Sequence, residues 1–269
     1  MTAHEHGSSH GIGQRIRFTQ QDGVARLRLI RPDAANAIDL TFAQELRVAV
    51  DACAADGARA VLISAEGKQF CGGGDLRSFA QQDDLSAHLG EVLAELHPAL
   101  ALLAELDAPI VIAVEGSVAG AGVGLVCAGD IVLASASSRF VMAYTAAGLT
   151  PDGSSSYFLP RLVGPRRALE MTLTNRPIGA AEALDWGLVT RVLPDGEVAA
   201  EAERLAVGFA TGPTLAFGSS KRLLRDANSD LAAHLDRERD AMLRSGSTAD
   251  GQEGVAAFAA RRPPAFSGD

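Results

Sequence analysis

The chain has 269 residues, of which 47% are hydrophobic and 21% are charged, a composition typical of one large globular domain. Its formal net charge of −9 argues against a nucleic-acid partner, because phosphate recognition requires a basic surface. The three cysteines lack zinc-ligand spacing and no apolar run is long enough to span a membrane, so we expect neither a metal site nor a membrane partner.

The start of the chain predicts a tail, a hairpin and a helix. Residues 1–13 lack the apolar core of a signal peptide, which predicts a flexible N-terminal tail and a cytoplasmic protein. Residues 16–18 and 24–30 are typical of a hairpin, because apolar residues alternate with arginines in the second strand. A helix is expected to begin near Asp39 or Thr41, and Thr41 has Gln44 at the spacing of a capping box.

Two apolar runs further along are each followed by a glycine-rich turn. Residues 60–64 predict a strand buried on both faces, and the sequence FCGGGDL follows it at residues 70–76. Residues 110–114 predict a second such strand, followed by glycines at residues 116–124 and a helix from about Ala121. The alternation of strand, turn and helix predicts an α/β fold with parallel strands.

Helices are expected to fill most of the remaining chain. Residues 85–106 have leucines at helical spacing, and Pro98 within them predicts a kink or a break near His97. From about residue 154 the pattern is helical, apart from a strand expected at residues 188–192. We therefore predict a core domain at residues 14–195 and a helical C-terminal oligomerisation region at residues 196–269.

The two glycine turns have a chemical interpretation. Glycine permits a positive φ and a close approach of backbone to ligand, and a helix that begins there directs free N–H groups at the same place. Two such turns after adjacent strands can aim two donors at one oxygen, which is an oxyanion hole. A phosphate cradle or tight packing of helix on strand are the alternatives.

Four motifs in order, from about Ile16 to Ala260, resemble those of the crotonase, or enoyl-CoA hydratase/isomerase, superfamily. They are FCGGGDL, DAPIVIAVEGSVAGAGVGLVCAGDIVLAS, GLTPDGSSSYFLPRLVG and LTNRPIGAAEALDWGLVTRVLP. The resemblance implies a spiral of ββα units with a helical C-terminal trimerisation region. It also implies a homotrimer or a hexamer that pairs two trimers, an acyl-CoA substrate, and no cofactor beyond the CoA of the substrate.

The resemblance also implies roles for individual residues. The two oxyanion donors would be the backbone N–H groups of Gly74 and Ala121. The acyl chain would contact Phe79 and Leu85, in the stretch where this family differs most. The remaining substrate- or CoA-binding candidates are Arg31, Ala35, Ala37, Gly73, Asp75, Leu76, Tyr144 and Lys221. For the charged residues among them, a structural or solvated role is the alternative.

The residues at the catalytic positions argue against a hydratase that uses two glutamates. The resemblance places those glutamates at positions held here by Gly124 and Tyr144, neither of which does carboxylate chemistry. Asp152, in LTPDG, stands where double-bond isomerases of the family, including epoxyphenylacetyl-CoA isomerases, carry their proton shuttle. The alternative for Asp152 is an ordinary turn residue in Pro-Asp-Gly.

A second resemblance within the family is to the chlorobenzoyl-CoA dehalogenases. They carry a nucleophilic aspartate at the position of Asp152 and a histidine at the position of His97, but a tryptophan where this chain has Tyr144. A histidine beside Pro98 can instead satisfy a freed carbonyl. We therefore expect an isomerase with Asp152 and His97 as catalytic residues. A dehalogenase-like hydrolase, a hydratase with other acid and base groups, and a non-catalytic CoA-binding subunit are the alternatives.

Overall fold

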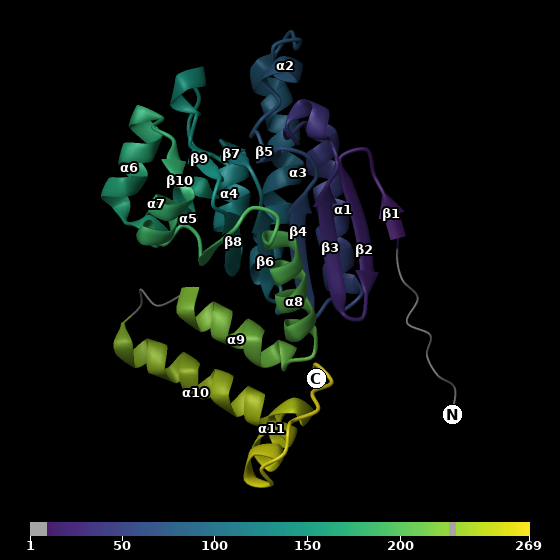
Figure 1. Cartoon of the computed structure of the whole chain (residues 1–269). Coiled ribbons are helices and arrows are strands. Elements are labelled where there is room, and N and C mark those ends of the chain that lie inside the picture. Colours follow the sequence, from purple (N-terminus) through teal and green to yellow (C-terminus); the bar gives the residue numbers. More distant parts are fainter. Residues whose placement is uncertain (1–9, 226–229) are drawn as a thin grey trace.

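The computed structural model describes residues 10–225 and 230–269 (Figure 1). Residues 1–9 of the expected tail lie outside the described residues. His10–Ile12 form a strand, β1, that pairs antiparallel with the first strand of the hairpin, so this part of the expected tail has a fixed place in the fold. Within the described residues, no helix is both long and apolar enough to cross a bilayer.

The larger of two sheets has seven strands in the order β1-β2-β3-β4-β6-β8-β11. Strands β2 and β3 form the predicted antiparallel hairpin, and every pair from β3 onward is parallel. Apart from β1, its strands are β2 (Ile16–Gln21), β3 (Val24–Leu29), β4 (Ala60–Ala65), β6 (Ile110–Val114), β8 (Ile131–Ser135) and β11 (Arg191–Leu193).

The smaller sheet has four strands in the order β10-β9-β7-β5, with β5, β7 and β9 parallel and β10 antiparallel. Strands β5, β7 and β9 each come directly after a strand of the larger sheet. The chain therefore repeats a strand–strand–helix unit, which confirms the expected mixed α/β architecture. The strands are β5 (Gln69–Cys71), β7 (Ser117–Ala119), β9 (Arg139–Val141) and β10 (Ile178–Gly179).

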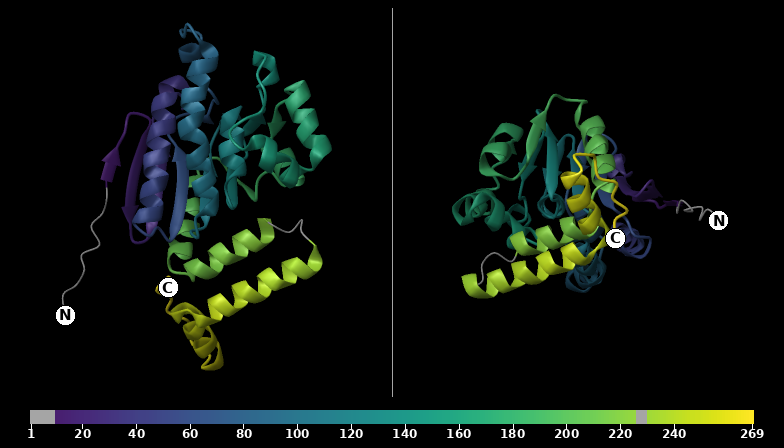
Figure 2. Two further views of the ribbon diagram at one scale, coloured as in Figure 1. Left: turned by 180° about the vertical axis from the view of Figure 1, so that it is seen from behind. Right: turned by 90° about the horizontal axis from the view of Figure 1, so that it is seen from below.

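Helices cover both faces of the larger sheet, because alternate residues of its strands point to opposite sides. Leu27 and Ile63 pack in one core cluster with helices α1 and α3, which lie side by side in Figure 2, whereas Leu62 and Val111 pack with α8 in another. The helices are α1 (Leu40–Ala55), α2 (Leu76–Phe79), α3 (Leu85–Glu105), α4 (Ala121–Cys127), α5 (Ser155–Val163), α6 (Pro165–Thr174), α7 (Ala180–Trp186), α8 (Val198–Ala210), α9 (Thr214–Arg225), α10 (Leu231–Ser247) and α11 (Ala249–Ala259), with short 3-10 turns η1 (Pro32–Ala34) and η2 (Thr145–Ala147).

The helices differ from the sequence predictions in two respects. Asp39, rather than Thr41, caps α1, because its carboxylate accepts the backbone N–H of Phe42 at 2.8 Å. Helix α3 continues through Pro98 without a break; Pro98 lies on an exposed face, where water can satisfy the carbonyl that loses its partner. Helix α8, which the prediction assigns to the C-terminal region beginning at residue 196, packs on the larger sheet; the domain boundary itself stays a prediction.

Candidate functional site

The two glycine turns come together because β5 and β7 are neighbouring parallel strands. Parallel strands lie about 4.8 Å apart and end at the same edge, so the turns that follow them are adjacent. A Cβ added to Gly73, whose φ is +85°, would lie 2.8 Å from the carbonyl oxygen of Ala119. Only glycine allows this approach, which explains why the first turn contains glycines in place of residues with side chains.

The backbone N–H groups of Gly74 and Ala121 are available to a ligand. Ala121 is the first residue of α4, so its N–H has no partner within the helix. In the turn around Gly74, the N–H groups of Gly72 and Asp75 donate to other backbone carbonyls. Across the described residues, no hydrogen bond from the N–H of Gly74 or Ala121 to another protein group is formed. These two N–H groups are what an oxyanion hole requires.

Both residues line a cavity of about 250 Å³ with mainly apolar walls. Asp152 and Tyr144 lie at its border, so the cavity joins the second glycine turn to the carboxylate singled out by the sequence. Phe79 lines it as expected, whereas Leu85 does not. The other residues of its wall are Ile38, Gly72, Gly73, Leu76, Leu89, Val92, Leu93, Leu96, Gly120, Ala143, Ala147, Leu149, Thr150 and Pro151.

The loop that carries Asp152 is fixed from several sides. The carbonyl of Asp152 accepts hydrogen bonds from the hydroxyls of Tyr144 at 3.0 Å and Ser155 at 2.6 Å. Burial and the nearby Asp152 carboxylate raise the pKa of Tyr144, so its phenol remains a donor. Ala143 and Ser154, at the two ends of the loop, both have positive φ values of 57° and 68°. Such strained residues persist only where the surroundings hold them.

Gly124 lies directly beneath this loop. A Cβ at position 124 would be 1.9 Å from the carbonyl oxygen of Gly153, so the backbone leaves no room for any side chain. The place that the resemblance assigns to a first glutamate is thus occupied by the Asp152 loop itself. Tyr144, at the place of the second glutamate, is committed to the carbonyl of Asp152.

His97 lies beside Asp152, although 55 residues separate them in sequence. Its Nε2 is 2.6 Å from Oδ1 of Asp152. The side chains of His97 and Asp152 are 51% and 29% exposed, so the pair is open to solvent on one side. The imidazole and the carboxylate therefore form one partly exposed hydrogen-bonded pair.

Arg31 and Asp75 form part of an ion-pair network under the first glycine turn. The Arg31 guanidinium lies 2.9 Å from carboxylate oxygens of both Asp39 and Asp75. Asp75 also caps α2 by accepting the N–H of Ser78, which favours the structural alternative for this residue. Arg15 pairs with Asp39 as well, at 2.8 Å. The network ties the start of α1 to the turn at Gly74.

Lys221 does not point into the site. Its ammonium group pairs with Asp130 at 2.7 Å and donates to the carbonyls of Leu106 and Ala108 at 3.0 and 2.8 Å. Burial lowers the pKa of Lys221, against the opposing effect of Asp130. All three N–H donors are used, so the geometry does not support the expected contact with a CoA phosphate.

The remaining candidates lie along the rim of the cavity or against the first turn. Leu76 lines the cavity and is half exposed. Ala35 has a left-handed φ of 56°, and its carbonyl accepts the N–H of Gly72 at 2.8 Å. Ala37 is buried next to Ile38, whose N–H donates to Gly73. Ala35 and Ala37 therefore shape the turn, and their contact with CoA stays a prediction.

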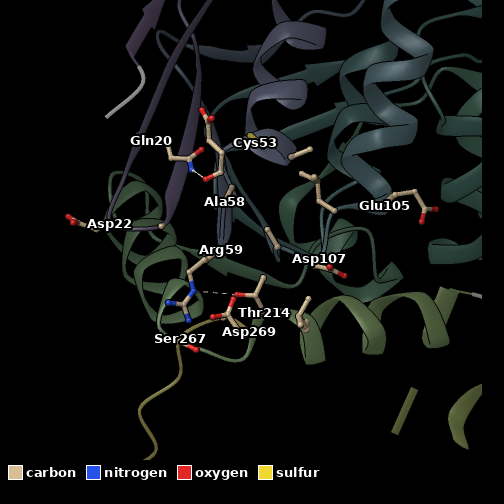
Figure 3. Close-up of a pocket in the computed structure, with 18 of the residues that line it drawn as sticks. Gln20, Asp22, Cys53, Ala58, Arg59, Glu105, Asp107, Thr214, Ser267 and Asp269 are labelled. Atoms are coloured by element: carbon tan, nitrogen blue, oxygen red, sulfur yellow. Dashed lines mark hydrogen bonds between the residues drawn. The ribbon is translucent and has the colours of Figure 1, made fainter. Parts of the chain in front are cut away.

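A larger cavity of about 1300 Å³ lies elsewhere, at the amino ends of β3, β4 and β6 and next to α9 (Figure 3). Arg59 within it donates to Thr214 at 3.4 Å and to the carbonyl of Gly212 at 2.9 Å. It contains none of the predicted site residues. Within the described residues, no three His, Cys, Asp or Glu side chains gather as a metal site.

Comparison with known proteins identifies the family. The family model described as enoyl-CoA hydratase/isomerase matches residues 19–269. The chain belongs to the enoyl-CoA hydratase/isomerase family. It is 36% identical to the 1,2-epoxyphenylacetyl-CoA isomerase of Escherichia coli (strain K12), over 92% of this chain and 96% of that protein. It is 32% identical to a 4-chlorobenzoyl coenzyme A dehalogenase of an Arthrobacter species, over 80% and 79%.

A solved structure of the same family confirms the expected fold. The crystal structure of an enoyl-CoA hydratase from Polaromonas sp. JS666 is 32% identical, with a TM-score of 0.87 over 93% of this chain and 98% of that one. The relatives of this chain thus include proteins named isomerase, dehalogenase and hydratase. Membership of the enoyl-CoA hydratase/isomerase family is therefore established, while the reaction has to be argued from the site.

The sequence analysis did not predict the side of the cavity that helix α3 forms. Val92, Leu93 and Leu96 on α3 line the cavity, although the leucine spacing of this helix predicts only a core face. The sequence feature that could have predicted this wall is the high apolar content of residues 89–103, which exceeds what a single buried face of a helix needs.

Proposed function

We propose that this chain is an enoyl-CoA isomerase, with Asp152 as the group that moves the proton. The observation that carries the proposal is one cavity that combines two free N–H donors with a single carboxylate. In this reaction Asp152 removes a proton from C2 of a 3-enoyl thioester. The resulting dienolate has its charge on the thioester oxygen, where Gly74 and Ala121 donate, and Asp152 returns the proton to C4.

The surroundings of Asp152 support an isomerase over a hydratase. Addition of water in this family requires a second acid or base, and the two positions available for it hold Gly124 and Tyr144. Gly124 has no room for a side chain, and Tyr144 is kept protonated by burial. A double-bond shift needs one carboxylate only, because the same group takes and returns the proton.

A second candidate is a hydrolase like the chlorobenzoyl-CoA dehalogenases, favoured by the 2.6 Å contact between His97 and Asp152. In that reaction the Asp152 carboxylate attacks the ring carbon and expels halide. A water molecule, losing its proton to His97, then cleaves the aryl ester and restores the carboxylate. The leaving group must be on an aromatic acyl chain for this chemistry.

A time course with liquid chromatography and mass detection tests these candidates. The purified protein is incubated with a 3-enoyl-CoA, a 2-enoyl-CoA and 4-chlorobenzoyl-CoA in turn, alongside Asp152→Asn. Conversion of the 3-enoyl to the 2-enoyl ester without gain of water, lost in the variant, is the expected result. Water addition that survives in Asp152→Asn would refute the role of Asp152, and binding without any turnover would favour a non-catalytic subunit.

We further propose that the C-terminal helices pack on other copies of this chain, as a homotrimer or a hexamer. Helix α10 contacts both α9 and α11, and α10 and α11 extend away from the core (Figure 1). They carry large exposed apolar side chains that a second subunit would cover. Those side chains are Leu231, Leu235, Met242, Leu243, Val255 and Phe258. Light scattering during gel filtration gives the mass, and a monomer would refute this proposal.

A further inference from the structure

Residues 31–39 hold the first glycine turn from both sides of Gly74. The N–H of Gly72 donates to Ala35 at 2.8 Å, and the N–H of Ile38 donates to Gly73 at 2.7 Å. On the other side, the N–H of Asp75 donates to the carbonyl of Ile38 at 2.9 Å. The N–H of Gly74 has no protein partner among the described residues, and the peptides on both sides of Gly74 are held by residues 31–39.

Arg31 anchors this segment with both its backbone and its side chain. Its backbone N–H donates to Oδ1 of Asn36 at 2.8 Å, and Asn36 in turn donates to the carbonyls of Glu66 and Gln69. Its Nη1 lies 2.9 Å from Oδ2 of Asp39 and 2.9 Å from Oδ2 of Asp75. One nitrogen therefore joins the cap of α1 to the residue that follows Gly74.

The two carboxylates depend on Arg31 to different degrees. Asp39 has a second partner in Arg15, at 2.8 Å. For Asp75, whose side chain is only 8% exposed, Arg31 is the one cation within ion-pair distance in the part of the chain that the structure describes. A nearly buried carboxylate without a cation is strongly unfavourable, so we expect Asp75 to move toward solvent when Arg31 is removed. The Gly74 N–H belongs to the peptide that joins Gly73 to Gly74, and the carbonyl of this peptide accepts the N–H of Ile38. Ile38 in turn accepts the N–H of Asp75, so we expect a shift of Asp75 to reach this peptide through Ile38.

We propose that Arg31 is a positioning residue for the oxyanion hole, acting through Asp75 on the N–H of Gly74, and not a ligand of a CoA phosphate. The inference rests on the proposed use of Gly74 as an oxyanion donor. A donor works only when it points at the oxygen that gains charge, and displacement by about 1 Å weakens it severely. The guanidinium charge is already balanced by two carboxylates, which leaves Arg31 poorly suited to bind a phosphate.

The direct test measures polarisation of the thioester carbonyl and does not require turnover. The carbonyl ¹³C resonance of [1-¹³C]hexanoyl-CoA, a saturated ester, is compared free and bound at saturating protein. Wild type is expected to shift it downfield, and Arg31→Gln to lose most of that shift. Arg31→Lys, which keeps one cationic nitrogen, is expected to restore part of it. Arg15→Gln is the matched control, because it removes an ion pair from the same Asp39 and leaves Asp75 paired.

Kinetics with two substrates separate positioning from phosphate binding. Arg31→Gln is expected to lower kcat by about 10- to 100-fold, somewhat less than the loss of a whole oxyanion donor. The loss should be equal for a CoA ester and for the pantetheine ester, which lacks the nucleotide. A defect confined to KM of the CoA ester, and absent with the pantetheine ester, would overturn the inference in favour of a phosphate contact.

The NMR result also distinguishes failure here from failure of the proposed reaction. A downfield shift in wild type without any isomerisation would refute the isomerase and leave the role of Arg31 intact. A wild-type shift that Arg31→Gln retains in full would refute the positioning role alone. Absence of a shift in the bound wild-type complex would refute both, because no oxyanion hole would then exist.

Discussion

Substitution of Gly124 by alanine tests how closely catalysis depends on the placement of the Asp152 loop. The added Cβ would lie 1.9 Å from the carbonyl oxygen of Gly153 and 3.3 Å from that of Asp152. Cβ atoms essentially never approach a backbone atom closer than 3.0 Å. The loop or helix α4 must therefore move by about 1 Å, and the loop is the part that carries the carboxylate.

The size of both effects follows from this displacement. A misplacement of about 1 Å costs roughly 100-fold in rate, so kcat of Gly124→Ala is expected to fall by about that factor. Overpacking costs about 1–3 kcal/mol, while replacing a helical glycine with alanine returns about 1 kcal/mol. The severe contact places the cost at the upper end, which leaves a net loss of about 2 kcal/mol in the free energy of unfolding.

Isomerisation of a 3-enoyl-CoA and urea denaturation are the two assays for this variant. Gly90→Ala is the matched control, because nothing lies within 4 Å of a Cβ at that position of helix α3. It is expected to keep full activity and to gain up to about 1 kcal/mol of stability. A folded Gly124→Ala protein with kcat within about threefold of wild type would refute the link between the loop position and the reaction.

Three other predictions concern charged and titratable residues. Burial raises the pKa of Asp39, but hydrogen bonds from Arg15 and the Phe42 backbone, together with the charges of Arg15 and Arg31, lower it by more. The pKa of Asp39 in the folded state therefore lies below the unfolded value of about 3.9. Its contribution to stability is present above about pH 4 and is lost as the pH falls further. Urea denaturation at several pH values should show that the free energy of unfolding falls less on acidification in Asp39→Asn than in wild type, and an equal fall in both proteins would contradict this. Lys221→Met leaves Arg225 as the one cation paired with Asp130 among the described residues, and should lower the free energy of unfolding by about 3 kcal/mol without changing KM for the CoA ester. A raised KM would favour the contact of Lys221 with a CoA phosphate. His97→Gln should slow isomerisation by about tenfold or less, whereas Asp152→Asn abolishes it; equal losses would make the histidine a full partner in the chemistry.

The sequence was most informative where one local cause determines the structure. Alternation around Leu27 predicted the face of β3 that packs on the helices, and the apolar run at residues 60–64 predicted a strand buried on both sides. The glycines of both turns could be interpreted because their backbone geometry excludes a side chain. The family and fold followed from these motifs, and the comparisons confirm them.

The sequence was least informative where the partner of a residue is distant along the chain. Lys221 reads as a surface charge in its own helix, and only the fold brings it to Asp130 and to the carbonyls before β6. Thr41 and Gln44 fit a capping box, but Asp39 takes the cap because two arginines from other segments hold its carboxylate there. Pro98 predicts a break, yet packing along the whole of α3 outweighs one lost hydrogen bond.

The placement of the two N–H donors on successive strand–strand–helix units has a consequence for how new activities can arise in this scaffold. Gly74 and Ala121 follow neighbouring strands of the small sheet, so the sheet brings the two N–H groups to the same edge. Asp152 lies instead on a separate connection between β9 and α5. Under the proposed roles, charge stabilisation and the choice of reaction belong to different segments of the chain. Exchange of residues 144–154 is therefore expected to redirect the chemistry while both N–H donors are kept.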